Sequence, residues 1–90
     1  NGNSTAYAQI LTWSAGRLRW YFNRRVFANG PLEVEDLVQD TLLVVHAKWH
    51  TFDPSRPYVP WLQAVARHKL IDALRRLHHN VSIPLDDVQD

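Results

Sequence analysis

The segment that decides the fold is YVPWLQAVARHKLIDALRRLH, which runs from Tyr58 to His78. Its apolar residues recur every three or four positions, so the segment predicts an α-helix with one core-facing stripe. The core-facing stripe contains Val59, Leu62, Ala66, Leu70, Ala73 and Leu77. The opposite stripe contains Trp61, Ala64, Arg67, His68, Ile71 and Arg75.

This opposite stripe lacks the mixed charges of an ordinary solvent-exposed helix face. It carries an indole, two guanidinium groups and an imidazole, and the nearest carboxylate, Asp72, stands at its margin. Cationic side chains beside flat aromatic rings are typical of surfaces that bind nucleic acids. The spacing of Asp72 and Arg76 also predicts an i, i+4 ion pair, which would neutralise part of this charge.

The composition fits one small domain of 90 residues without cysteine, which excludes disulfides and thiolate metal sites. No apolar run approaches the roughly 18 residues that span a bilayer, and no signal peptide is visible, so we expect a cytoplasmic location and no membrane partner. The sequence has no methionine. We therefore expect it to be a fragment of a longer product.

The net charge is only +1, but the charges form blocks. Residues 1–30 contain four arginines and no acid, residues 31–54 contain five acids against Lys48, and residues 55–79 contain five basic residues against Asp72. Such blocks predict two surfaces of opposite sign, and hence two partners.

The first helix is expected to be capped by Ser4 or Thr5 and to run to about Val26. Its core stripe is predicted to contain Tyr7, Ala8, Leu11, Ala15, Leu18, Phe22 and Val26. A second stripe contains Ile10, Trp13, Arg17, Trp20 and Arg24. It is either a binding surface or a side covered by neighbouring helices, with arginine stems lying along the indoles, and we favour the second interpretation.

Asn29-Gly30-Pro31 is expected to end the first helix through a glycine in the left-handed conformation. The next helix is predicted from Val34 to Trp49, and its acidic start suits the positive end of the helix dipole. Its core stripe contains Val38, Leu42, Val45 and Trp49. The opposite face contains Asp36, Gln39, Asp40, Leu43 and Ala47, and it is either a docking face for a basic partner or a solvated face with one exposed leucine.

Residues 51–60, TFDPSRPYVP, are predicted to form a loop in which Asp53-Pro54 opens a turn and two aromatic residues, Phe52 and Tyr58, fix the loop to the body. Such a loop either presents a pocket or is a plain connector. From Asn80 the helical pattern ends, and residues 80–90 are expected to be an extended linker.

The sequence shows no site for catalysis, cofactor or metal. It lacks a glycine-rich phosphate loop, paired carboxylates and a nucleophile beside a histidine, so we do not expect an enzyme. His46 and His50 have the i, i+4 spacing of a helical metal pair, but no third ligand accompanies them.

The segment DLVQDTLLVVHAKWHTFDPSRPYVPWLQAVARHKLIDALRR, residues 36–76, resembles region 2 of bacterial extracytoplasmic-function (ECF) sigma factors of the sigma-70 family. The matching motifs are D-L-V-Q-D, T-F-D-P, W-L-x-x-x-A-R and I-D-x-L-R-R, in this order. The resemblance implies a compact all-α bundle of three to four helices over residues 1–79. The linker of residues 80–90 would follow, and the C-terminal region 4 of such factors lies outside this sequence.

The resemblance also implies a transcription initiation factor with two kinds of site. Asp36, Gln39 and Asp40 match the motif that contacts the β′ coiled coil of RNA polymerase core, and Leu43 lies on the same face. Other positions match those that recognise and melt the minus-ten promoter element, with one non-template base flipped out against the loop. These positions are Phe52, Ser55, Arg56, Tyr58, Trp61, Arg67, His68 and Arg75, with Lys69 and Arg76 serving phosphates.

Trp61 departs from the family pattern of primary sigma factors, which carry two adjacent tryptophans at this point. Here the pair is Pro60-Trp61, so Trp61 either contacts DNA or packs on the loop. Two alternative functions remain. In the first, the chain is an interaction module that mainly binds an anti-sigma factor through its Trp13 and Trp20 stripe. In the second, the chain is a self-sufficient domain that binds duplex DNA.

Overall fold

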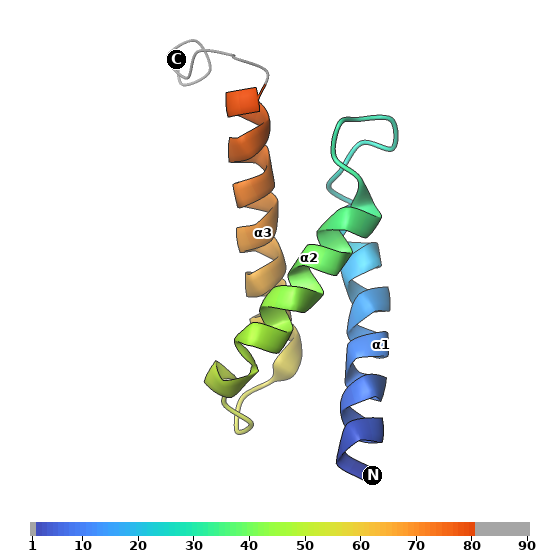
Figure 1. Ribbon diagram of the computed structural model, residues 1–90, viewed down its shortest axis with the longest axis vertical. Coiled ribbons are helices and arrows are strands. Elements are labelled where there is room, and N and C mark those ends of the chain that lie inside the picture. The colour runs from blue at the N-terminus through green and yellow to red at the C-terminus, as the bar shows by residue number, and fades with distance from the viewer. Residues whose placement is uncertain (1, 81–90) are drawn as a thin grey trace.

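The computed structural model describes residues 2–80 of the chain, and all of its regular structure is helical. The order is α1 (Gly2–Asn23), α2 (Val34–Ala47), a short 3-10 helix η1 (Trp49–Thr51) and α3 (Tyr58–Asn80). Figure 1 shows α2 running obliquely between α1 and α3, whose axes stand nearly upright on either side of it. The expected three-helix, all-α fold is thus confirmed over these residues. Of the expected linker of residues 80–90, Asn80 is the last residue of α3, and residues 81–90 lie outside the described part of the chain.

The core forms where α2 crosses the two longer helices. α1 contributes Leu18, Tyr21 and Phe22, α2 contributes Leu37, Val38 and Val45, and α3 contributes Leu62, Val65 and Ala66. Burial of each large apolar side chain in this set contributes about 1.5–3 kcal/mol to folding. The predicted stripe of α2 therefore faces the core, and so do Leu62, Ala66, Leu70 and Ala73 of the predicted α3 stripe. Val59 and Leu77 of that stripe are half-buried outside this set, whereas Val65, which was not predicted, is buried in it.

Two hydroxyl groups are buried in this apolar core, and both are hydrogen-bonded. Thr41 Oγ1 donates to the carbonyl oxygen of Leu37 at 2.6 Å, within its own helix. The hydroxyls of Ser14 and Tyr58 are 2.7 Å apart and join α1 to the start of α3. Because an unpaired buried hydroxyl costs about 1–3 kcal/mol, each bond keeps its helix face compatible with burial.

Both ends of α1 differ from the prediction. The helix begins at Gly2, so Ser4 and Thr5 lie inside its first turns rather than at a cap. It ends at Asn23, where the backbone N–H groups of Arg25 and Val26 both donate to the carbonyl oxygen of Phe22 at 2.9 Å. This local turn stops the helix well before Gly30, which does not adopt a left-handed φ.

The end of α2 also differs from the prediction. The helix stops at Ala47 and the chain continues as the 3-10 turn η1. Both the backbone N–H and the hydroxyl of Thr51 donate to the carbonyl oxygen of Lys48, at 2.8 and 2.7 Å. These two bonds tighten the chain, and Trp49 still packs against the core as expected.

Among residues 2–80, no helix is both long and apolar enough to cross a lipid bilayer.

Candidate functional site

The loop between α2 and α3 is organised by the side chain of Asp53. Asp53 Oδ1 accepts hydrogen bonds from the backbone N–H of Ser55 at 3.0 Å and from its hydroxyl at 2.8 Å. The backbone N–H of Arg56 donates to the carbonyl oxygen of Asp53 at 3.0 Å, and Arg56 Nε lies 3.7 Å from Asp53 Oδ2. The hydrogen bonds from Ser55, the backbone one foremost, hold the pKa of Asp53 below its usual value. The predicted Asp53-Pro54 turn is therefore present.

Four aromatic rings fix this loop to the body of the protein. Trp49, Phe52, Tyr58 and Trp61 all contact one another, with ring centroids 5.3–6.1 Å apart. Such pairs add about 0.5–1.5 kcal/mol each beyond the burial of their area. Burial also raises the pKa of the Tyr58 hydroxyl. Trp61 packs on the loop, as one of its two predicted placements requires, and it is only half-buried.

A depression of about 380 Å³ opens on the outer side of this aromatic cluster. Its walls are formed by residues of the loop and of the first turn of α3, namely Thr51, Phe52, Asp53, Arg56, Pro57, Pro60 and Trp61. Its volume falls in the range of about 300–1,000 Å³ that is usual for small-ligand sites. Flat rings beside a hydrogen-bond acceptor and a cationic donor suit a planar heterocycle such as a nucleobase. The loop thus presents a pocket rather than a plain connection.

The cationic stripe of α3 is open to solvent. Arg67, His68 and Arg75 are exposed, whereas Lys69 and Ile71 are half-buried. The predicted ion pair between Asp72 and Arg76 is not formed: in the described part of the chain the ion pairs are Arg19–Glu35 and Arg56–Asp53. The positive charge of α3 is therefore less neutralised than the sequence suggested.

The acidic face of α2 is also open. Asp36, Gln39 and Asp40 are exposed, and Leu43 on the same face is 67% exposed. Glu35, on the flank toward α1, accepts a hydrogen bond from Arg19 Nε at 2.7 Å, and this bond raises the pKa of Arg19. Asp36, Gln39, Asp40 and Leu43 are therefore exposed together, as the sequence predicted for this face of α2.

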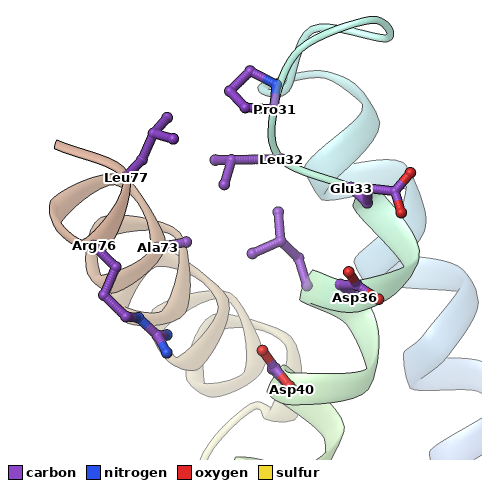
Figure 2. A pocket seen from close by; sticks show the side chains of 9 residues that line it. Pro31, Leu32, Glu33, Asp36, Asp40, Ala73, Arg76 and Leu77 are labelled. Carbon is purple, nitrogen blue, oxygen red and sulfur yellow. The ribbon is translucent and has the colours of Figure 1, made fainter. Parts of the chain in front are cut away.

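The structure adds a groove that helical spacing within single helices did not reveal. It lies between the start of α2 and the end of α3, and its apolar floor includes Leu32, Leu37, Ala73 and Leu77. Figure 2 shows Leu32 and Leu77 pointing into the space between the helices, with Asp40 on the α2 rim and Arg76 on the α3 rim. Asp36 also lines the groove. Residues that the sequence assigned to two different partners thus border one groove.

The second stripe of α1 is exposed, which corrects the interpretation that neighbouring helices cover it. Trp13 is 52% and Trp20 50% exposed. The guanidinium carbons of Arg17 and Arg24 do lie near the Trp20 ring, 5.1 and 4.9 Å from its centroid. The arginines therefore contact the indole as expected. However, α2 and α3 leave Trp20 half exposed, and Trp13 is also half exposed although its ring lies 6.4 Å from that of Tyr58 at the start of α3.

His46, on α2, has a structural role because it contacts Tyr7 near the N-terminal end of α1. Its Nδ1 is hydrogen-bonded to the Tyr7 hydroxyl at 2.7 Å, and the Tyr7 ring also packs edge-on against Trp49 at 5.4 Å. Residues 4–79 contain no group of three potential metal-ligating side chains.

The match to a known family covers most of the chain. The family described as Sigma-70 region 2 matches residues 14–79, from the middle of α1 to the last turn of α3. No solved structure gave a significant match.

Three curated relatives are similar to this chain. The ECF RNA polymerase sigma factor SigF of Caulobacter vibrioides is 46% identical over 90 residues, which cover 100% of this chain and 50% of the relative. The ECF RNA polymerase sigma factor RpoE of Cereibacter sphaeroides is 42% identical over 75 residues, 82% of this chain and 40% of the relative. The RNA polymerase sigma factor CnrH of Cupriavidus metallidurans is 33% identical over 78 residues, 83% of this chain and 38% of the relative.

The chain therefore spans half or less of the length of each of these relatives. The matched region includes the acidic face of α2, the turn at Asp53 and the cationic stripe of α3. Taken together, the family match, the relatives and the helical architecture show that this chain belongs to the Sigma-70 region 2 family, as the region 2 of an ECF-type sigma factor.

Proposed function

We propose that this chain docks on RNA polymerase core through the acidic face of α2 and contacts the minus-ten promoter element through α3 and the preceding loop. The observation that carries the proposal is the coexistence of two exposed surfaces of opposite charge on one small domain. Asp36 and Asp40 have no ion-pair partner among the described residues, and neither do Arg67 and Arg75. Each surface is thus available to a partner of the opposite charge.

The docking surface combines charge with one apolar anchor. Asp36, Gln39, Asp40 and Leu43 recur at helical spacing, so their side chains lie in one row along α2. Carboxylates steer a basic partner and fix its register, whereas an exposed leucine supplies area that is buried on contact. A basic helix such as those of the β′ coiled coil suits this row.

The DNA surface combines the loop pocket with the cationic stripe of α3. A base leaving the duplex costs a few kcal/mol, and stacking on an aromatic ring returns about 1–3 kcal/mol per base. Phe52 and Trp61 offer rings at the pocket, while Ser55, Arg56 and Tyr58 hold or flank the loop. We propose that the exposed Arg67, His68 and Arg75, with the half-buried Lys69, contact DNA along α3.

The free energy gained by stacking a base is similar to the free energy spent in flipping it out of the duplex. We therefore expect the isolated chain to bind DNA weakly and with a strong dependence on salt. Docking on polymerase would then supply the missing free energy by raising the effective concentration of the DNA surface at the promoter. The proposed activity is binding and strand capture, without a covalent step.

The proposal is tested by measuring both interactions on one variant. Asp40→Arg reverses a charge at the centre of the docking face and leaves the DNA surface intact. We expect it to lower the affinity for core polymerase by at least about tenfold, since like-charge contacts at an interface cost several kcal/mol. Its affinity for a fluorescent non-template minus-ten strand should stay the same or rise slightly. Retained binding to core polymerase would refute the docking surface.

A second candidate function is favoured by the exposed stripe of α1. Trp13 and Trp20 are half exposed, which is unusual for large indoles on a monomer surface. A protein partner such as an anti-sigma factor would bury both rings. Substituting both tryptophans by alanine should then weaken that partner alone and leave binding to polymerase and to the minus-ten strand unchanged.

A further inference from the structure

The groove between α2 and α3 is built by two helix ends that the sequence assigned to different partners. Its floor is apolar, with Leu37 from α2 and Ala73 and Leu77 from α3. Its rims carry opposite charges, Asp36 and Asp40 on one side and Arg76 on the other (Figure 2). The groove therefore has an apolar floor between two rims of opposite charge.

The charges on the two rims do not neutralise each other. In the described part of the chain, the ion pairs involve Arg19, Glu35, Asp53 and Arg56 alone. Asp40 and Arg76 thus face the groove without an ion pair, and both are exposed. A ligand lying between the rims could pair with both signs at once.

We infer that the α3 rim of this groove, and Arg76 in particular, belongs to the polymerase-docking surface and not to the DNA surface. One helix of the polymerase lies along the groove, with apolar side chains on its floor and basic side chains on the α2 rim. A carboxylate of the same helix pairs with Arg76. This inference rests on the proposed docking of α2 on polymerase and extends that surface onto α3.

The chemistry of the groove favours a helix as the occupant. An amphipathic helix in an apolar groove is a recurrent mode of recognition. Asp36, Asp40 and Leu43 lie four and three residues apart on α2, which corresponds to steps of about 6 and 4.5 Å along its axis. Successive turns of a partner helix present side chains at a similar spacing. The groove is also continuous with the docking face, because Asp36 and Asp40 belong to both.

The same geometry disfavours a phosphate at Arg76. A phosphate bound there would lie close to the carboxylates of Asp36 and Asp40 and be repelled by them. Arg75 is in a different position, although it is the adjacent residue. Successive residues of a helix are about 100° apart, so Arg75 falls on the stripe of Arg67 and His68, away from the groove.

The adjacent arginines therefore provide a matched pair of variants. Arg76→Glu and Arg75→Glu change the net charge equally, so they share any long-range effect on a polyanion. Each variant, together with Asp40→Arg and the unmodified chain, is titrated against core polymerase and against a fluorescent non-template minus-ten strand. Circular dichroism verifies that each variant is folded, which is expected because both arginines are exposed.

We expect Arg76→Glu to lower the affinity for core polymerase by about tenfold, because it places a carboxylate against the acidic residue of the partner. Arg75→Glu should leave that affinity unchanged and should weaken strand binding more than Arg76→Glu does. The inference is wrong if Arg76→Glu binds core polymerase normally while Asp40→Arg does not, or if it weakens strand binding as much as Arg75→Glu. If Asp40→Arg also binds core polymerase normally, the proposed docking itself fails, and this inference fails with it.

Discussion

The acidic face of α2 and the loop pocket before α3 are built in different ways, although both are candidate binding surfaces. The acidic face is a row of exposed side chains on one regular helix, and its geometry needs nothing beyond the helix itself. The pocket depends on tertiary contacts, because its walls stand on four mutually packed rings and on the turn held by Asp53. A substitution on the acidic face should therefore remove only the contacts of that side chain. A substitution in the loop pocket should also disturb the neighbouring rings and the turn that hold the pocket.

The largest effect should come from removing the ring at the centre of the aromatic cluster. Trp49→Ala deletes contacts with Tyr7, Phe52, Tyr58 and Trp61. Since Trp→Ala in a core costs about 3–5 kcal/mol and Trp49 is only half-buried, we expect a loss near 3 kcal/mol in the free energy of unfolding. Urea denaturation measures this loss.

The Trp49→Ala variant also tests whether the acidic face of α2 and the loop pocket act independently. In a chain kept folded at low temperature, Trp49→Ala should weaken binding of the minus-ten strand because the loop is no longer held. Binding to core polymerase should persist, because Asp36 and Asp40 lie in the first half of α2, whereas Trp49 follows the end of that helix. Equal losses of both activities would contradict the independence of the two surfaces.

A smaller effect is expected from each arginine of the cationic stripe. Arg67→Ala and Arg75→Ala should each weaken binding of the minus-ten strand and reduce the salt slope of log K by roughly one unit per lost phosphate contact. Anisotropy titrations at several salt concentrations measure both quantities. Lys48→Ala, at the exposed basic residue that follows the last residue of α2, is the control and should leave the slope unchanged. If neither arginine alters the slope, the stripe does not contact phosphates.

The smallest effect concerns the titration of Asp53. Its folded-state pKa is lowered by hydrogen bonds from Ser55, so its ionised form stabilises the loop at pH values above its unfolded pKa of about 3.9. This contribution is lost as the pH falls through the folded pKa. We expect Asp53→Ala to reduce the difference in melting temperature between pH 5 and pH 3. An unchanged difference would show that the turn does not depend on this carboxylate.

The sequence predicted best what helical periodicity determines within a single element. The exposed row of Asp36, Gln39, Asp40 and Leu43, and the buried positions Leu62 and Ala66, follow from the 3.6-residue repeat alone. The turn at Asp53 also followed, because Asp-Pro carries its own local hydrogen-bond pattern. The family resemblance then supplied the partners, which periodicity cannot name.

Features that depend on how helices meet were missed. The groove beside Arg76 exists because the end of α3 faces the start of α2, and no spacing within either helix reports this. The exposure of Trp20 was mispredicted for the same reason, since helical spacing cannot show which sides of α1 are covered. The end of α1 at Asn23 is set by two bonds to the carbonyl oxygen of Phe22 rather than by a glycine signal.

The central claim is that α2 anchors this chain on polymerase while α3 and its loop hold the melted strand. The most direct test is the affinity of a fluorescent non-template minus-ten strand, measured with the chain alone and with the chain plus core polymerase. The account predicts weak binding by the chain alone, much tighter binding with core polymerase, and loss of this gain in Asp40→Arg. Tight binding by the chain alone, or an undiminished gain in Asp40→Arg, would contradict it.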